Sequence, residues 1–186
     1  MRYAFPLRRS LVTLMALPAL TAALAGCPPP PETVPYVDLS RYVGKWFEIA
    51  SYEVFFNEGL TGVTAEYGIL PDGKISVKNR GFAGSLDGPE DSIEGKARVV
   101  DKTTNAKLAV RFNQPFGALF EGSYWIVDLD AENYEWAVVS DPTRFTLFIL
   151  SRTPQMDDAT LDPILERLAD QGFDLDKLNF TPQPAL

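Results

Sequence analysis

Residues 61–81 read TGVTAEYGILPDGKISVKNRG, and their pattern predicts the fold class. Its centre, Pro71-Asp72-Gly73, is a tight-turn signal, because proline presets φ and glycine accepts the positive φ that such turns need. After the turn, Ile75 and Val77 occupy one face of an extended chain, while the alternating positions are polar or charged. The stretch therefore predicts two antiparallel strands with one buried face.

Eight runs of this kind follow one another, with short connections, after residue 38. Sequential strands joined by short turns are typical of an up-and-down antiparallel barrel, although periodicity alone also allows a sandwich. We predict an all-β fold: an eight-stranded up-and-down antiparallel β-barrel with one C-terminal α-helix packed outside. The predicted strands are 44–53, 61–70, 74–81, 92–101, 106–113, 120–129, 134–140 and 145–151.

The last predicted strand, 145–151, is apolar on both faces, so another element must cover its outer side. A helix after residue 154 fits this role, with Pro163 expected in its first turn. The tail 180–186 carries two prolines and is predicted to be extended. The N-cap candidates of the helix lie within 157–160, its apolar stripe is Leu161, Leu165 and Leu168, and its stop is Gly172.

The first 26 residues look like a leader rather than part of the fold. A basic start with three arginines precedes a mostly apolar stretch, which is the pattern of a signal peptide. Leu24-Ala25-Gly26-Cys27 resembles the lipobox of bacterial lipoprotein precursors, which implies cleavage before Cys27 and lipidation of its thiol. Pro28, in place of Asp, implies sorting to the outer membrane. We therefore predict a signal peptide over 1–26, a stiff proline-rich tether over 27–37 that lifts the domain off the lipid, and a single domain over 38–186.

The composition of the chain excludes several classes of function. The 186 residues carry a formal net charge of −8, and the leader holds arginines but no acid, so the rest of the chain is more acidic still. An acidic domain without a basic stripe argues against nucleic acid as a partner. The chain has no histidine and one cysteine, which removes the commonest general base, the commonest metal ligand and any intrachain disulfide. We therefore expect that the protein binds no metal or cofactor and is not an enzyme.

Three blocks in order resemble those of the lipocalins. They are GKWFEIA at 44–50, YWIVDLD at 124–130 followed by Tyr134, and LSRTP at 150–154. Within the family the chain is most similar to bacterial outer-membrane lipoprotein lipocalins, through FFNEGL at 55–60, GVTAEY at 62–67, EGKA at 94–97 and FILSRTP at 148–154. That resemblance implies an anchored carrier of fatty acids or lysophospholipids that serves lipid transport or envelope maintenance.

The family's structural signature falls on Gly44, Trp46 and Arg152. A barrel needs one sealed end, and the Trp46 ring is large and apolar enough to plug it. Arg152 can then lie over the indole as a cation–π partner and donate to the carbonyls of the turn at 40–43. We assign these residues to structure and not to ligand contact.

The inside of an eight-stranded barrel holds one small ligand, so the predicted site is the cavity. Alternation along the strands selects its lining, in which Tyr67 and Tyr124 offer hydroxyls to a head group. The candidates are Ala65, Tyr67, Ile75, Val77, Ile93, Ala97, Leu108, Val110, Phe112, Tyr124, Phe148 and Leu150.

The rim of the cavity is expected to be aromatic and basic. Phe55, Phe56, Phe82 and Phe116 are predicted in or beside loops of the open end. Arg80, Arg111 and Arg144 are expected near the same end, where they would attract an anionic head group.

Two other functions remain open from the sequence. A structural or adaptor lipoprotein without a ligand would need no cavity. An enzyme would need an acid–base pair, for which Glu48 and Glu94 are the available carboxylates. The sequence also leaves open a homodimer, and an anchor in the outer membrane favours the periplasmic side for the domain.

Overall fold

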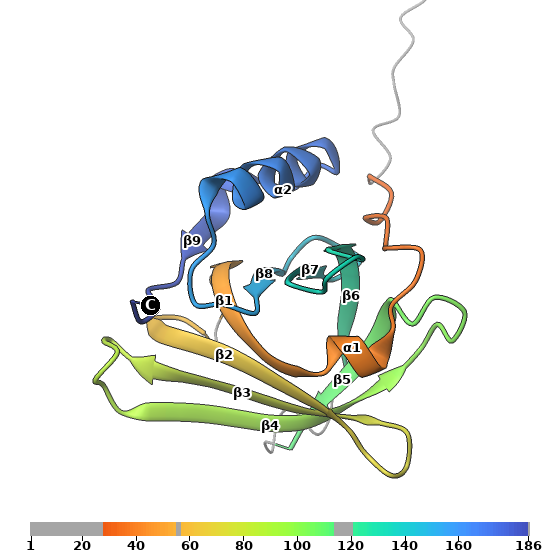
Figure 1. Cartoon of the computed structure of the whole chain (residues 1–186), viewed down its shortest axis with the longest axis horizontal. Coiled ribbons are helices and arrows are strands. Elements are labelled where there is room, and N and C mark those ends of the chain that lie inside the picture. The colour runs from red at the N-terminus through yellow and green to blue at the C-terminus, as the bar shows by residue number, and fades with distance from the viewer. Residues whose placement is uncertain (1–27, 55–56, 114–120, 186) are drawn as a thin grey trace, which may run out of the picture.

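The computed structural model describes residues 28–54, 57–113 and 121–185, and its strands curl around a common axis (Figure 1). The chain opens with a short helix, continues through eight strands, and ends with a longer helix and a ninth strand. In order, the elements are α1 (Leu39–Tyr42), β1 (Gly44–Tyr52), β2 (Leu60–Ile69), β3 (Ile75–Ala83), β4 (Glu90–Val99), β5 (Lys107–Phe112), β6 (Gly122–Leu129), β7 (Trp136–Ser140), β8 (Leu147–Ser151), α2 (Asp158–Asp170), the 3₁₀ helix η2 (Leu175–Lys177) and β9 (Leu178–Phe180).

The eight strands β1 to β8 form a closed antiparallel barrel. Each strand from β2 to β7 pairs with the next, and β1 closes the ring by pairing with both β8 and β2. Across the predicted hairpin, Val77 lies opposite Tyr67 and Ile75 lies opposite Ile69. The barrel prediction is confirmed, and a sandwich is excluded because a sandwich would leave the edge strands unpaired.

Strand β1 changes partners along its length. Its first residues, Gly44 to Phe47, pair with β2. A bulge between Glu48 and Ala50 then bends the strand, and its last residues pair on one side with β8 and on the other with β9. The ninth strand, which was not predicted, ends at Phe180 opposite Ala50, and so overlaps the predicted tail only at its first residue. Residues 181–185 form neither helix nor strand, as predicted for an extended tail.

Helix α2 covers the barrel from outside, over β1, β7 and β8. Asp157 caps it, with its carboxylate accepting from the Thr160 N–H at 2.8 Å. Leu161 and Leu168 are buried as predicted, and Ile164 completes the buried stripe while Leu165 packs only partly against it. Pro163 lies one turn later than expected, inside the helix, so that prediction was wrong by a turn.

The two ends of the barrel differ. Because the chain runs up and down, α1 and the β2–β3, β4–β5 and β6–β7 turns lie at one end, which we call the closed end. The β3–β4 and β7–β8 turns lie at the other end, which we call the mouth. The interior core begins at the closed end with Val37, Tyr42 and Trp46.

The segment that precedes α1 is fastened to the barrel. The Val37 N–H donates to the Thr104 carbonyl at 2.7 Å, and the Val34 N–H donates to the Ile126 carbonyl at 3.0 Å. Val37 is fully buried, and the Pro29 carbonyl accepts from Arg144 at 2.8 Å. The prediction of a spacer free of the domain is therefore wrong where these bonds form, because Pro29, Val34 and Val37 find partners on β6 and on two turns of the barrel.

The predicted signal peptide and Cys27 lie outside the described residues. Among the residues that are described, no helix is both long and apolar enough to cross a bilayer.

Candidate ligand-binding site

The closed end is sealed by Trp46 and Arg152. The indole is fully buried, and the guanidinium carbon of Arg152 lies 3.6 Å from its ring centroid. The Arg152 Nη2 group donates to the carbonyls of Arg41, Tyr42 and Val43 at 2.7, 3.1 and 3.1 Å. One cation thus covers the plug and also ties down the last turn of α1, as expected from the sequence.

Gly44 makes room for this arrangement. Its φ of +100° is a conformation that residues with a side chain rarely adopt. A Cβ at this position would also lie 3.3 Å from Arg152 Nη1. The same arginine nitrogen donates to the Lys45 carbonyl at 2.9 Å, so a larger residue at 44 would disturb the seal directly.

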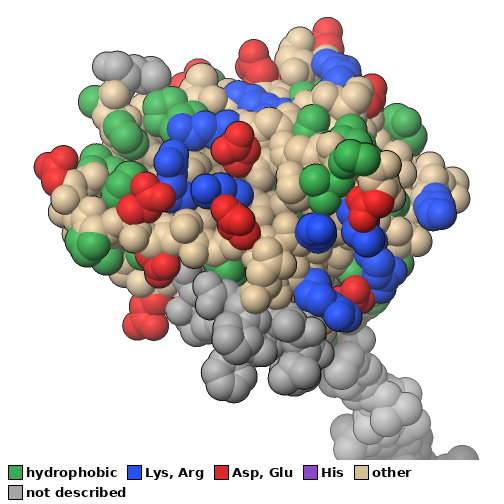
Figure 2. Space-filling model, turned by 90° about the horizontal axis from the view of Figure 1, so that it is seen from below, with side chains coloured by type: hydrophobic (Ala, Val, Ile, Leu, Met, Phe, Trp, Pro, Cys, Tyr) green, Lys and Arg blue, Asp and Glu red, His purple; other side chains and the backbone are tan. Residues whose placement is uncertain are grey.

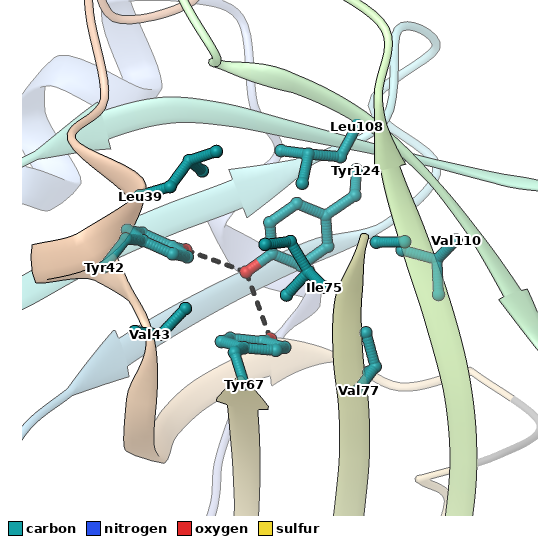
Figure 3. Close-up of a pocket in the computed structure, with 10 residues that line it drawn as sticks. Leu39, Tyr42, Val43, Tyr67, Ile75, Val77, Leu108, Val110 and Tyr124 are labelled. Carbon is teal, nitrogen blue, oxygen red and sulfur yellow. Dashed lines mark hydrogen bonds between the residues drawn. The ribbon is translucent and has the colours of Figure 1, made fainter. Parts of the chain in front are cut away.

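Above the seal lies a small cavity of about 20 Å³ (Figure 3). Space of that size holds about one water molecule. Its wall is apolar apart from tyrosine hydroxyls. The lining residues are Leu39, Tyr42, Val43, Tyr67, Ile75, Val77, Ala97, Leu108, Val110 and Tyr124.

Three tyrosines form a hydrogen-bonded chain at this cavity. Tyr124 Oη donates to Tyr67 Oη at 3.1 Å and lies 2.8 Å from Tyr42 Oη (Figure 3). A phenol has one proton, so Tyr42 must donate to Tyr124. The proton of Tyr67 is then left over, and no described residue accepts it. Tyr67 thus presents an unused donor within the barrel.

These hydroxyls stay neutral. Burial raises the pKa of Tyr67 to about 12, and it raises the pKa values of Tyr42 and Tyr124 well above the ordinary value. The rings also pack on one another, with centroids 6.0 Å apart for Tyr42 and Tyr67 and 5.9 Å apart for Tyr67 and Tyr124. The three tyrosines are therefore neutral and packed together, and they place a hydrogen-bond donor on an otherwise apolar surface.

Most of the predicted lining lies where alternation placed it. Ala65 and Leu150 are buried in the same interior core without lining the cavity, and Phe112 and Phe148 pack partly against that core nearer the mouth. Ile93 is only half-buried and lies outside the core. The predicted residues that do line the cavity are Tyr67, Ile75, Val77, Ala97, Leu108, Val110 and Tyr124.

Three further lining residues, Leu39, Tyr42 and Val43, were not predicted from the sequence. They belong to α1 and the residue after it, and a helix of four residues is too short to show an apolar period. One signal was available: Asp38 precedes Ser40, and its carboxylate accepts from the Ser40 N–H at 2.9 Å as an N-cap.

Arg80, Arg111 and Arg144 lie toward the mouth as predicted, but they do not gather into a basic rim. Arg80 and Arg111 point outward from the barrel, where they lie 3.8 Å from Glu90 and 3.7 Å from Glu121. Figure 2 shows basic and acidic side chains intermixed on the face it presents. Arg144 is held by the backbone carbonyls of Pro29 and Gln171.

The aromatic rim is only partly covered by the described residues. Phe82 alternates outward on β3, because the inward positions of that strand are Ile75 and Val77. Phe55, Phe56 and Phe116 lie outside the described residues.

The two carboxylates considered for catalysis do not form a pair. Glu48 is buried and accepts from Ser51 Oγ at 3.0 Å and from Thr181 Oγ1 at 2.6 Å. Glu94 is exposed on the outer face of β4, 3.3 Å from Lys78. In the described part of the chain, no three acidic or cysteine side chains gather as they would around a metal ion.

Comparison with known proteins agrees with the fold. Residues 37–183 match the family model of the lipocalin-like domain. The chain is 42% identical over 163 residues to the outer membrane lipoprotein Blc of Vibrio cholerae, which covers 86% of this chain and 92% of that protein. It is 37% identical over 179 residues to Blc of Escherichia coli K12, covering 94% and 98%, and 32% identical over 166 residues to mouse apolipoprotein D, covering 86% and 84%.

Solved structures show the same architecture. Insecticyanin from the tobacco hornworm superposes with a TM-score of 0.66 at 20% identity, covering 86% of this chain and 87% of that one. Apocrustacyanin C1 gives a TM-score of 0.63 at 18% identity, covering 80% and 81%. At such identities the structures speak for the fold alone, whereas the family model and the sequence relatives show descent: the chain belongs to the lipocalin family.

Proposed function

We propose that this lipocalin is an envelope lipoprotein that carries a small apolar ligand, a fatty acid or a lysophospholipid, for lipid transport or envelope maintenance. Cys27 carries the lipid anchor, and the domain faces the periplasm from the outer membrane. The names of the bacterial relatives support this location, since they are outer membrane lipoproteins.

One observation carries the ligand proposal. The barrel interior is sealed at one end, lined by apolar side chains, and provided with a spare hydroxyl donor on Tyr67. An acyl chain gains about 25 cal/mol for each Å² it buries against such a wall. A carbonyl or ester oxygen of the ligand would accept the Tyr67 proton.

The cavity must widen for this to happen. Its present volume of about 20 Å³ holds water but no alkyl chain. The half-buried Phe112 and Phe148, which pack against the core toward the mouth, are the side chains best placed to change rotamer as a ligand enters. We therefore expect the acyl chain above the tyrosines, between the cavity floor and the mouth.

A titration with a fluorescent fatty acid tests the proposal. Ala97 is buried in the cavity wall, and Ala109 lies on the outer face of the adjacent strand β5. Ala97→Leu should weaken binding at least tenfold, because its added atoms fill the cavity, and Ala109→Leu should leave binding unchanged. Equal affinity for wild type and both folded variants would reject the interior site.

The small cavity also favours a second candidate, an adaptor lipoprotein whose barrel holds no ligand. Mass spectrometry of lipid extracted from protein purified out of its own membranes separates the two. One reproducible acyl species near unit stoichiometry supports the carrier. Its absence, together with no saturable binding of oleate or lysophospholipid, supports the adaptor.

A further inference from the structure

The first described residues of the chain are fastened at the mouth of the barrel. Arg144 lies in the β7–β8 turn and donates from Nη1 to the Pro29 carbonyl at 2.8 Å. The same side chain donates from Nε to the Gln171 carbonyl at 2.9 Å and lies 5.6 Å from the Phe173 ring centroid. Figure 1 shows the N-terminal segment reaching the end of α2, where these contacts meet.

The turn that holds Pro29 also presents an exposed aromatic ring. Phe145, the residue after Arg144, is 75% exposed, more than any other large hydrophobic residue among those described. The turn is rigid, because the Asp141 carboxylate accepts from the Thr146 N–H at 2.6 Å and from the Thr146 hydroxyl at 2.9 Å, and also bonds Thr143. Phe145 is thus held outward by a fixed loop.

The anchor must leave the domain beside this ring. Cys27 precedes Pro29 by two residues, and two residues span at most about 7 Å of chain. Other exposed apolar residues, such as Ile69 and Val100, lie at the closed end, so exposure alone does not choose between the ends. The bond between Arg144 and Pro29 does distinguish the two ends, because it brings the lipid-anchored end of the chain to the mouth.

We propose that the membrane which holds the anchor also contacts the mouth end of the barrel, with Phe145 inserted at the lipid–water interface. The mouth then opens toward the lipid, and an acyl ligand passes between bilayer and barrel with little exposure to water. This orientation rests on lipidation of Cys27, as in the proposed function. It replaces the raised, tethered domain that the proline run suggested.

Tryptophan quenching by brominated phospholipid tests the orientation. Lipidated protein is reconstituted into vesicles of brominated phosphatidylcholine, with Phe145→Trp as the probe and Ile69→Trp as the matched control at the closed end. Emission is compared with that of wild type, which has three tryptophans of its own. We expect the added tryptophan at 145 to be quenched several-fold more than the one at 69. Equal quenching, or stronger quenching at 69, would overturn the proposal.

The N-terminal mass of the same sample separates this inference from its premise. An unacylated N-terminus would reject the anchor and the orientation together. An acylated Phe145→Trp protein whose added emission is the same in brominated and unbrominated vesicles would reject the orientation and leave the lipoprotein proposal standing.

A second substitution tests whether the fastening sets the orientation. Arg144→Gln, in the Phe145→Trp background, removes the bond to Pro29 and should lower the quenching at least twofold. Arg167→Gln is the control, since Arg167 bonds Asp128 on the barrel wall and has no contact with Pro29. Quenching that survives Arg144→Gln would show that the link between Arg144 and Pro29 does not direct the mouth to the membrane.

Discussion

Arg152 links several parts of the closed end through one side chain. Its guanidinium covers Trp46 and donates to backbone carbonyls of α1 and β1. It also donates to the carbonyl of Tyr134, which lies in the turn before β7. Burial lowers the pKa of the Arg152 guanidinium from the usual arginine value. Arginine side chains nevertheless stay protonated in proteins. The residue is therefore a permanent charge at the base of an apolar barrel.

Replacing this cation should loosen the closed end. Arg152→Ala removes the cation–π contact and leaves several carbonyls without a donor, and we expect a loss of about 2–4 kcal/mol in the free energy of unfolding. Thermal unfolding measures the loss, and Trp emission should shift to the red as Trp46 becomes wetter. Arg98→Ala, at an exposed ion pair with Glu121, should change little. Equal Tm values for the two variants would contradict the structural role of Arg152.

Glu48 predicts a pH dependence of stability. Burial raises the pKa of this carboxyl above its ordinary value, although bonds from Thr181 and Ser51 oppose the rise. The folded state therefore holds the proton at pH values where the unfolded state has lost it, and stability falls as pH rises from the unfolded pKa of about 4.5 through the folded one. Glu48→Gln keeps the acceptor oxygen and removes the titration.

We expect Glu48→Gln to raise Tm relative to wild type at pH 7 by more than it does at pH 4. Differential scanning calorimetry across this range measures the gap, and Glu66→Gln on the exposed face of β2 serves as the control. A Tm difference between Glu48→Gln and wild type that is the same at both pH values would show that Glu48 does not titrate differently in the folded state.

At the scale of elements, local signals predicted the strands well. The hairpin at 61–81 needed only a turn tripeptide and alternation, and β2 and β3 lie within two residues of their predicted ends. Strand β9 and helix α1 were not predicted, because each is too short to show a local sequence pattern. Residues 178–180 form β9 because β1 stops pairing with β2 after Phe47 and so has an unpaired edge there. The sequence of 178–180 itself gives no sign of this pairing.

The candidate site shows the same division. Alternation identified most of the cavity lining, since the side-chain period of a strand is a local property. It could not identify Tyr42, which enters the cavity from a separate helix, nor could it give the hydrogen-bonded chain of Tyr42, Tyr124 and Tyr67. Those facts depend on tertiary placement.

The split between β1 and β2 is bridged by the C-terminal tail, and one residue of that tail is testable. Gln183 Nε2 donates to the Glu48 and Val63 carbonyls, each at 2.8 Å, and so links the two strands past their last ladder pair. Gln183→Ala should cost about 1–3 kcal/mol by leaving these carbonyls unsatisfied. Gln155→Ala, at an exposed bond to Pro184, should cost less. Urea unfolding that ranks the two variants in the opposite order would contradict the bridging role.

For the whole molecule, ligand binding and stability should be linked. A ligand that binds only the folded barrel raises the free energy of unfolding by about 2.7 kcal/mol when its concentration is one hundred times the Kd. Oleate should therefore raise the Tm of wild type in a concentration-dependent way and leave that of Ala97→Leu nearly unchanged. A shift of the same size in both proteins would place the fatty acid outside the cavity.

The order in which the strands join also governs how the barrel is made. Strand β1 finds two of its neighbours, β8 and β9, only among the last forty residues of the chain. Contacts of such sequence separation form slowly, because the long intervening loop must first be ordered. A chain that lacks its C-terminal segment therefore cannot close the barrel. If the protein is exported unfolded, as the proposed function requires, this delay keeps the chain unfolded until its final segment has crossed the membrane.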